Sequence, residues 1–88
     1  MHITGEIDAE TAPALTARLD EMLDPATTAC VDLSGVTFMD SSGIRVLVLQ
    51  FMRFQHSGGH LEISGASSMV RRVFDISGAA ELVKWKAS

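Results

Sequence analysis

The apolar residues of three segments recur at the spacing of one face of a helix. Each boundary of these segments carries a helix signal. Thr11 and Ser67 are expected to cap the first and third helices, while Asp24-Pro25, Ser57-Gly58-Gly59 and Gly78 are expected to end the three helices in turn. The predicted helices therefore cover about residues 12–23, 42–56 and 68–76.

Between the predicted helices, apolar and polar residues alternate, which is the period of a strand with one exposed face. A turn is predicted at Gly5–Glu10, and a second at Ser34-Gly35 is followed by a connecting run from Val36 to Met39. Strands are expected at Met1–Thr4, Ala29–Leu33, His60–Ser64 and Leu82–Lys86.

Strands separated by helices of this length form βαβ units, with parallel strands and right-handed crossovers. A parallel sheet covered on both faces has continuously apolar strands, yet here Val31 and Leu33 flank the polar Asp32. We therefore expect every helix to pack on one face. The predicted fold class is α/β, a right-handed βα superhelix with a mainly parallel four-stranded sheet.

Composition limits the class of protein. The chain has 88 residues, 47% of them hydrophobic, which predicts one small domain spanning residues 1–88. A net charge of −4 and scattered basic residues argue against nucleic acid as a partner. Cys30 is alone and is expected to be a small buried thiol in a reducing compartment. No signal peptide or membrane span is recognisable, so we expect a cytoplasmic protein without a membrane partner.

The stretch Met39 to Gly43, MDSSG, joins a strand-like run to the second predicted helix. Asp40, Ser41 and Ser42 can all cap a helix, and one cap would be enough. The alternative is that one serine is modified, because a helix N-terminus tolerates a phosphate. Ser41 is expected at or beside the N-cap, with Ser42 helping to start the helix. Gly43 would leave room for another backbone to approach.

A helical wheel divides the second helix into two faces. On the face turned away from the core, Val46 and Leu49 lie among Arg45, Gln50 and Arg53, beginning one turn from Ser41. Single exposed apolar residues are ordinary, but apolar side chains beside arginine are also typical of protein interfaces. The residues expected to face the core are Ile44, Leu47, Val48, Phe51, Phe54 and Gln55.

Asp8 lies in the loop after the first predicted strand, with Glu6. Loops that follow parallel strands gather at one end of the sheet, so this loop should approach Asp40 and Ser41. Asp8 either forms the turn or contacts a partner, and the residues leave both open.

The residues argue against an enzyme. DSSG is not a nucleophile elbow, no phosphate-binding loop is present, and none of the histidines lies in a recognisable triad context. His2 and His60 are expected on the open sheet face and His56 at the far end of a helix. We expect no catalytic residue, no metal site and no cofactor.

Three blocks of the chain resemble the STAS domain of the anti-sigma-factor antagonist family. These blocks are GEID at Gly5–Asp8, VDLSGVTFMDSSG at Val31–Gly43 and VRRVFDISG at Val70–Gly78. The resemblance implies a βα superhelix that binds an anti-sigma factor that is also a serine kinase. It implies that this kinase phosphorylates Ser41 and that a serine phosphatase resets the site. The same domain type also serves as a non-switching scaffold subunit, for instance in lipid-transport complexes.

The chain departs from the family pattern at both ends. The usual first strand and the C-terminal helix are expected to be missing. An uncovered edge strand at Met1–Thr4 would then offer unpaired backbone groups, and a homodimer could form through that edge.

Overall fold

The protein is described from a computed structural model that covers residues 1–86. Three strands alternate with three helices along the chain, and a short 3₁₀ helix follows the last helix. In chain order the elements are β1 (His2–Ile7), α1 (Ala12–Met22), β2 (Thr28–Met39), α2 (Ser41–Ser57), β3 (His60–Ser64), α3 (Ser68–Ser77) and η1 (Ala79–Glu81).

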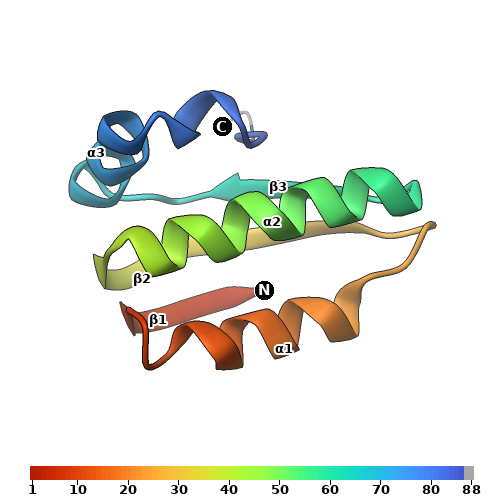
Figure 1. The fold of residues 1–88 in the computed structure, drawn as a ribbon, viewed down its shortest axis with the longest axis horizontal. Coiled ribbons are helices and arrows are strands. Elements are labelled where there is room, and N and C mark those ends of the chain that lie inside the picture. The colour runs from red at the N-terminus through yellow and green to blue at the C-terminus, as the bar shows by residue number, and fades with distance from the viewer. Residues whose placement is uncertain (87–88) are drawn as a thin grey trace.

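The three strands form one parallel sheet in the order β1-β2-β3. Figure 1 shows α1 and α2 lying side by side across one face of this sheet, with α3 and η1 beyond β3. Buried positions alternate with exposed or half-buried ones along β3, as the one-sided packing requires. The α/β class, the parallel strands and the single covered face are therefore confirmed. The fully buried side chains between sheet and helices include Leu19, Leu33, Leu47, Phe54, Leu61 and Phe74.

The sheet has three strands within the described residues, so the predicted fourth strand at Leu82–Lys86 is wrong. Gly78 ends α3 with a φ of 78°, and η1 then takes up Ala79–Glu81. The segment Leu82–Lys86, which follows η1, makes a single parallel bridge, between Ile63 and Trp85. The Ile63 N–H donates to the Lys84 carbonyl oxygen at 2.9 Å, and the Lys86 N–H donates to the Ile63 carbonyl oxygen at 2.8 Å. The Trp85 ring also packs edge-on against Phe74 with 5.0 Å between centroids, so backbone bonds and this side chain both hold the segment.

The predicted turns are also partly wrong. β1 continues through Ile7, with an irregular register around Gly5, whose φ is 84°. β2 continues through Ser34 and Gly35, where the pairing with β1 shifts. A Cβ atom on Gly35 would lie 2.7 Å from Cγ2 of Thr4, so this glycine allows close strand approach and does not make a turn.

The inner face of α2 differs from the predicted wheel at two glutamines. Gln50 is buried at 2% exposure, whereas Gln55 is exposed. Val48 and Phe51 pack only partly against the core. The reason is that α2 packs against α1 as well as against the sheet, which turns its buried arc toward α1.

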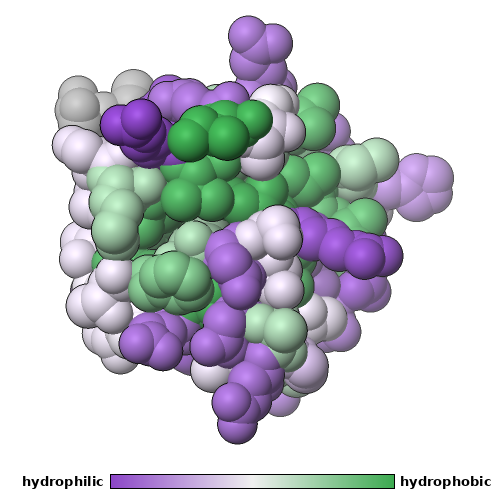
Figure 2. All heavy atoms as spheres, turned by 60° about the vertical axis from the view of Figure 1, so that its left-hand side comes forward, coloured by the Kyte–Doolittle hydropathy of each residue, from purple (hydrophilic) through white to green (hydrophobic). Residues whose placement is uncertain are grey.

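Several large hydrophobic side chains remain on the surface. Figure 2 shows apolar atoms forming a band across one side of the molecule, bordered by hydrophilic residues. Single exposed apolar residues are common on proteins, so only their neighbours can indicate whether they belong to a binding surface. The large hydrophobic residues with the most exposure are Phe38, Leu49, Met52, Met69, Ile76 and Leu82.

Candidate functional site

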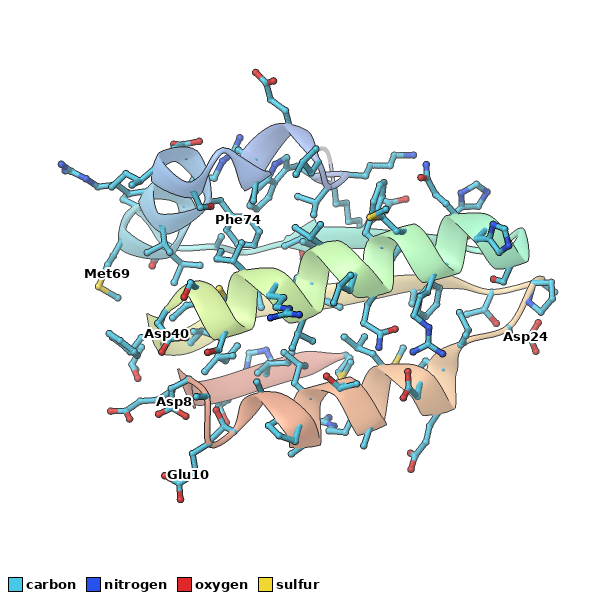
Figure 3. The ribbon with its side chains drawn as sticks, in the orientation of Figure 1. Asp8, Glu10, Asp24, Asp40, Met69 and Phe74 are labelled. Atoms are coloured by element: carbon cyan, nitrogen blue, oxygen red, sulfur yellow. The ribbon has the colours of Figure 1, made fainter. Side chains whose placement is uncertain are left out.

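The loops that follow β1 and β2 lie together at one end of the sheet. Ile7 pairs with Met39 at the ends of the two strands, and the Asp40 N–H donates to the Ile7 carbonyl oxygen at 3.2 Å. Figure 3 shows Asp8 and Asp40 at the same end of the molecule. The predicted approach of the Asp8 loop to the MDSSG motif is therefore confirmed.

Asp40 is the residue that caps α2. Its backbone is extended, and its Oδ1 accepts a hydrogen bond from the Ser42 N–H at 2.8 Å. Ser41 is the first residue of the helix, beside the N-cap as expected, and its side chain is exposed. Within residues 1–86 the Ser41 hydroxyl has no hydrogen-bond partner, so α2 does not need it as a cap.

Ser42 takes part in starting the helix only through its backbone. The N–H that bonds to Asp40 would be present with any residue except proline at this position. The half-buried Ser42 side chain instead lines a groove between α1 and α2. The prediction that the Ser42 side chain helps to start α2 is therefore wrong, because Asp40 supplies the capping oxygen.

Gly43 is buried against β1. A Cβ atom on Gly43 would lie 2.7 Å from Cγ2 of Ile7 and 2.8 Å from Cγ of Met39. The predicted need for space is correct, but the space is filled by side chains of this chain and not by another backbone. Gly43 thus lets the start of α2 sit directly on the ends of β1 and β2.

Asp8 organises its own loop. Its Oδ1 accepts hydrogen bonds from the N–H groups of Glu10 and Thr11, both at 3.0 Å. The Thr11 backbone bond is the main cause that lowers the pKa of the Asp8 carboxyl, so the charged form is favoured. Thr11 is the N-cap residue of α1, as predicted, but its side chain makes no cap bond, because its hydroxyl donates to the Glu6 carbonyl oxygen at 3.0 Å. The turn-forming role of Asp8 is confirmed.

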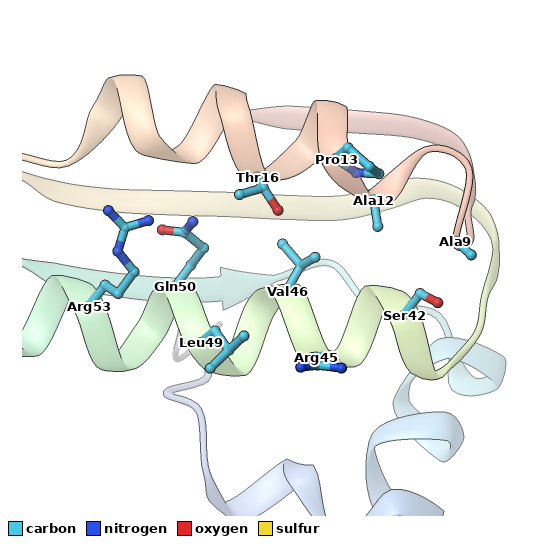
Figure 4. Close-up of a pocket in the computed structure, with 10 residues that line it drawn as sticks. All are labelled: Ala9, Ala12, Pro13, Thr16, Ser42, Arg45, Val46, Leu49, Gln50 and Arg53. Atoms are coloured by element: carbon cyan, nitrogen blue, oxygen red, sulfur yellow. The ribbon is translucent and has the colours of Figure 1, made fainter.

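The second half of the predicted site lies along α2. Arg45 and Leu49 are exposed, Leu49 by 49%, and Val46 is half-buried toward α1. Arg53 donates through Nη1 to Oδ1 of Asp20 on α1. All four predicted α2 residues line a groove of about 420 Å³ between the two helices, which Figure 4 shows in close-up.

The other wall of this groove was not predicted. It is formed by Ala9 in the loop before α1 and by three residues of α1: Ala12, Pro13 and Thr16. Gln50, which the helical wheel placed on the same face as Val46 and Leu49, also lines the groove from α2. The small residues Ala12 and Thr16 stand one helical turn apart beside the apolar stripe of α1, and this spacing was the available signal.

His2 and Asp32 lie on the open sheet face, where they were expected. Nδ1 of His2 is 3.0 Å from Oδ2 of Asp32. The Ser34 N–H and His2 together lower the pKa of Asp32 to about 2. The prediction of a buried thiol at Cys30 is wrong: this residue is half-buried, because it alternates with the buried Ala29 and Val31 along β2, and its Sγ lies 3.4 Å from Oγ of Ser64. In the part of the chain that the structure describes, no three His, Cys, Asp or Glu side chains form a metal-binding group.

Comparisons with known proteins decide the family. Residues 1–84 match the family model described as Mlab, STAS domain. The chain belongs to the STAS-domain family. No helix among residues 1–86 of this STAS domain has the length and apolar character needed to cross a membrane.

Its relatives include anti-sigma factor antagonists. The anti-sigma-B factor antagonist of Bacillus subtilis (strain 168) is 32% identical over 83 residues, which cover 94% of this chain and 76% of the relative. An anti-sigma factor antagonist from Mycobacterium paratuberculosis has a similar fold, with a TM-score of 0.82 and 24% identity over 99% of this chain and 74% of that one.

The antagonist SpoIIAA shares the same fold in both of its forms. The unphosphorylated form matches with a TM-score of 0.77 and 22% identity, covering 99% of this chain and 77% of that one. The phosphorylated form matches with a TM-score of 0.70 and 21% identity, covering 99% and 80%. The expected STAS fold and the family resemblance are thus both confirmed.

Proposed function

We propose that this STAS domain is an anti-sigma-factor antagonist that binds an anti-sigma factor with serine kinase activity, releases a sigma factor, and is switched off by phosphorylation of Ser41. The observation that carries the proposal is the exposed Ser41 hydroxyl, which α2 does not need because Asp40 caps the helix. The curated relatives named anti-sigma-B factor antagonists support the same reading. The domain itself would have no catalytic residue and no cofactor, and it would act in the cytoplasm.

The switch acts through charge and leaves the fold intact. A phosphate adds about −1.5 to −2 charges at neutral pH. At Ser41 this charge would stand on the first turn of α2, where the helix dipole favours an anion. It would also stand next to the Asp40 carboxylate, so a partner lying over this turn would meet repulsion and a desolvation cost. Phosphorylation therefore weakens binding without unfolding the domain.

The proposed contact surface runs from the loop end of the sheet along α2. A partner there would reach exposed and half-exposed groups of both loops, then the arginine and leucine side chains of the groove. Buried Gly43 would act by shaping the turn. A serine phosphatase would act on phosphorylated Ser41. The surface comprises Asp8, Asp40, Ser41, Ser42, Gly43, Arg45, Val46, Leu49 and Arg53.

The test uses the kinase-like anti-sigma factor encoded nearest to this chain. Calorimetric titration should show binding of the unphosphorylated domain, and binding should fall at least tenfold after incubation of the domain with the kinase and ATP. Phosphopeptide mapping should place the phosphate on Ser41. The Ser41→Ala variant should bind and resist inactivation. A phosphate mapped to Ser42, or undiminished binding by the phosphorylated domain, would overturn the switch.

A second candidate is a non-switching scaffold subunit of a lipid-transport or other regulatory complex. The observation that favours it is the matching family model, whose description is Mlab and not antagonist. Capture of partners from native lysate distinguishes the two candidates. Recovery of an ABC ATPase would support the scaffold, and recovery of a kinase-like anti-sigma factor would support the antagonist. The edge of β1 away from β2 carries no strand among the described residues, so a homodimer through that edge also stays a proposal.

A further inference from the structure

The groove between α1 and α2 has the character of a binding site. Its floor and walls are mostly apolar, formed by side chains such as Ala12, Pro13, Val46 and Leu49. A second hollow of about 520 Å³ shares Leu49 and Arg53 with it and continues along α2 to Ser57. The two hollows adjoin at Leu49 and Arg53 and together lie beside residues 42–57, a length of about 22 Å at the helical rise of 1.5 Å per residue.

A buried acceptor in the groove lacks a partner. Gln50 is 2% exposed, and its Nε2 donates to Oδ1 of Asp20 at 2.9 Å. Its Oε1 is buried and has no hydrogen-bond partner within residues 1–86. An unpaired buried carbonyl oxygen is unfavourable, and a hydrogen-bond donor inserted into the groove would satisfy it. In Figure 4 the Thr16 hydroxyl points from α1 toward the same gap.

The rim of the groove carries two arginines, one of them without an ion pair among the described residues, although the chain has a net charge of −4. Arg45 stands near one end and forms no ion pair among the described residues. Arg53 stands where the two hollows meet, paired with Asp20. Exposed apolar side chains of Leu49 and Met52 lie along the same edge. The complementary occupant is therefore apolar on one face and acidic at its margins.

A helix fits this groove better than an extended peptide. A helix satisfies its own backbone groups, and the walls of the groove are helices without free backbone edges. The length of about 22 Å matches a helix of about four turns. Tryptophan and tyrosine combine a large apolar body with one donor, which the apolar walls and Oε1 of Gln50 would both accommodate.

We propose that the α1–α2 groove receives an acidic amphipathic helix of the anti-sigma factor, with a tryptophan or tyrosine side chain that donates a hydrogen bond to Oε1 of Gln50. This inference rests on the proposed function, since it names the part of that partner which the groove binds. It extends the contact surface from the Ser41 end to the wall formed by α1, which the sequence did not predict.

The first experiment maps the occupant directly. A photo-crosslinking amino acid is placed at the exposed position Leu49, and separately at Met52, and the domain is irradiated with the anti-sigma factor. Crosslinks from both positions should reach a single helix of the partner that carries Asp or Glu beside Trp or Tyr. Crosslinks to a basic segment, to a loop, or to a second copy of this domain would overturn the inference.

Matched variants test the groove by affinity. Thr16→Trp fills the groove from α1 and should weaken binding at least tenfold. Ala17→Trp adds the same side chain at an exposed neighbouring position that does not line the groove, and should change affinity less than twofold. Gln50→Met removes the acceptor at similar volume and should weaken binding about threefold to tenfold, which corresponds to the loss of one ordinary hydrogen bond. Circular dichroism of each variant checks the fold.

The outcomes separate the two proposals. If the unmodified domain fails to bind the anti-sigma factor, the proposed function fails. If it binds but Thr16→Trp and Gln50→Met bind as tightly as the unmodified domain, the groove is not the contact and only this inference fails. Should Thr16→Trp not fold, the crosslinks from Leu49 and Met52 still decide where the partner helix lies.

Discussion

α2 and α3 both begin with a side-chain cap, but the two helix starts lie in different surroundings. Oδ1 of Asp40 accepts from the Ser42 N–H at 2.8 Å, and Oγ of Ser67 accepts from the Val70 N–H at 3.2 Å. An exposed serine follows each cap, Ser41 in α2 and Ser68 in α3. Both helices therefore begin with a satisfied cap and a serine that the cap does not use.

The surroundings of the two serines differ. The start of α2 is seated on the ends of β1 and β2 through buried Gly43, and the Asp8 loop lies beside it. The start of α3 presents Met69, which is 51% exposed. An exposed serine that the cap does not use is thus common to both helix starts, whereas buried Gly43, the acidic Asp8 loop and the groove distinguish the start of α2. This setting is what makes Ser41 the candidate for the switch.

The largest expected effect is on the free energy of unfolding, and it compares the packing of the first turns of α2 and α3. Gly43→Ala places a methyl group against Ile7 and Met39, so we expect a loss of about 1–3 kcal/mol in the free energy of unfolding. Met69→Ala at the start of α3 should cost less than about 0.5 kcal/mol because this side chain is half exposed. Urea unfolding of both variants measures the difference. Equal losses would mean that the start of α2 is no more tightly seated than that of α3.

The next effect separates charge from fold at the two serines. Ser41→Asp and Ser68→Asp both add an anion to the first turn of a helix, which is stabilising by about 0.3–1 kcal/mol. Both melting temperatures should hold or rise slightly. Only Ser41→Asp should weaken binding of the anti-sigma factor, by at least tenfold, or about 1.4 kcal/mol.

Calorimetric titration beside thermal melting tests this pair. Because one carboxylate carries less charge than a phosphate, undiminished binding by Ser41→Asp would be followed by titration of the phosphorylated domain. Weakened binding by Ser68→Asp as well would show that the contact extends to α3, which would break the comparison.

A smaller effect compares the caps themselves. Asp40→Ala and Ser67→Ala each remove one capping oxygen, so each should lower the free energy of unfolding by about 1 kcal/mol. Affinity for the anti-sigma factor should change only with Asp40→Ala, since Asp40 belongs to the proposed contact surface and Ser67 does not. If Ser67→Ala lowered the affinity as much as Asp40→Ala did, the loss of stability, and not the loss of a contact, would explain both effects.

Local signals explain which parts of the fold were predictable from the sequence. The cap at Ser67 and the glycines that end α2 and α3 act within one helical turn, and the predicted helices agree with the observed ones to within a residue or two. The turn predicted at Gly35 was wrong because this glycine makes room for Thr4 of the neighbouring strand, which is 31 residues away in sequence. Likewise, the predicted last strand is reduced to a single bridge between Ile63 and Trp85, whose ring packs on Phe74.

The candidate site divides in the same way. The MDSSG motif and the α2 side of the groove could be read from one segment and its helical period. Packing of α1 on α2 forms the α1 wall, including Thr16, and buries Gln50. No local sequence pattern predicts how these two helices pack. Asp40 took the capping role that the sequence shared among three residues, because only its backbone is extended at the junction.

The smallest expected effect tests that division of roles at the start of α2. Ser42 donates its backbone N–H to Asp40, and its hydroxyl makes no hydrogen bond within residues 1–86. Ser42→Ala keeps the N–H and favours the helix, so the free energy of unfolding should change by less than about 0.5 kcal/mol. Urea unfolding of Ser42→Ala beside Asp40→Ala measures both side chains in one series. A loss of about 1 kcal/mol with Ser42→Ala would assign a capping role to the Ser42 hydroxyl, and Ser41 would then no longer be the one serine at this turn that is free for modification.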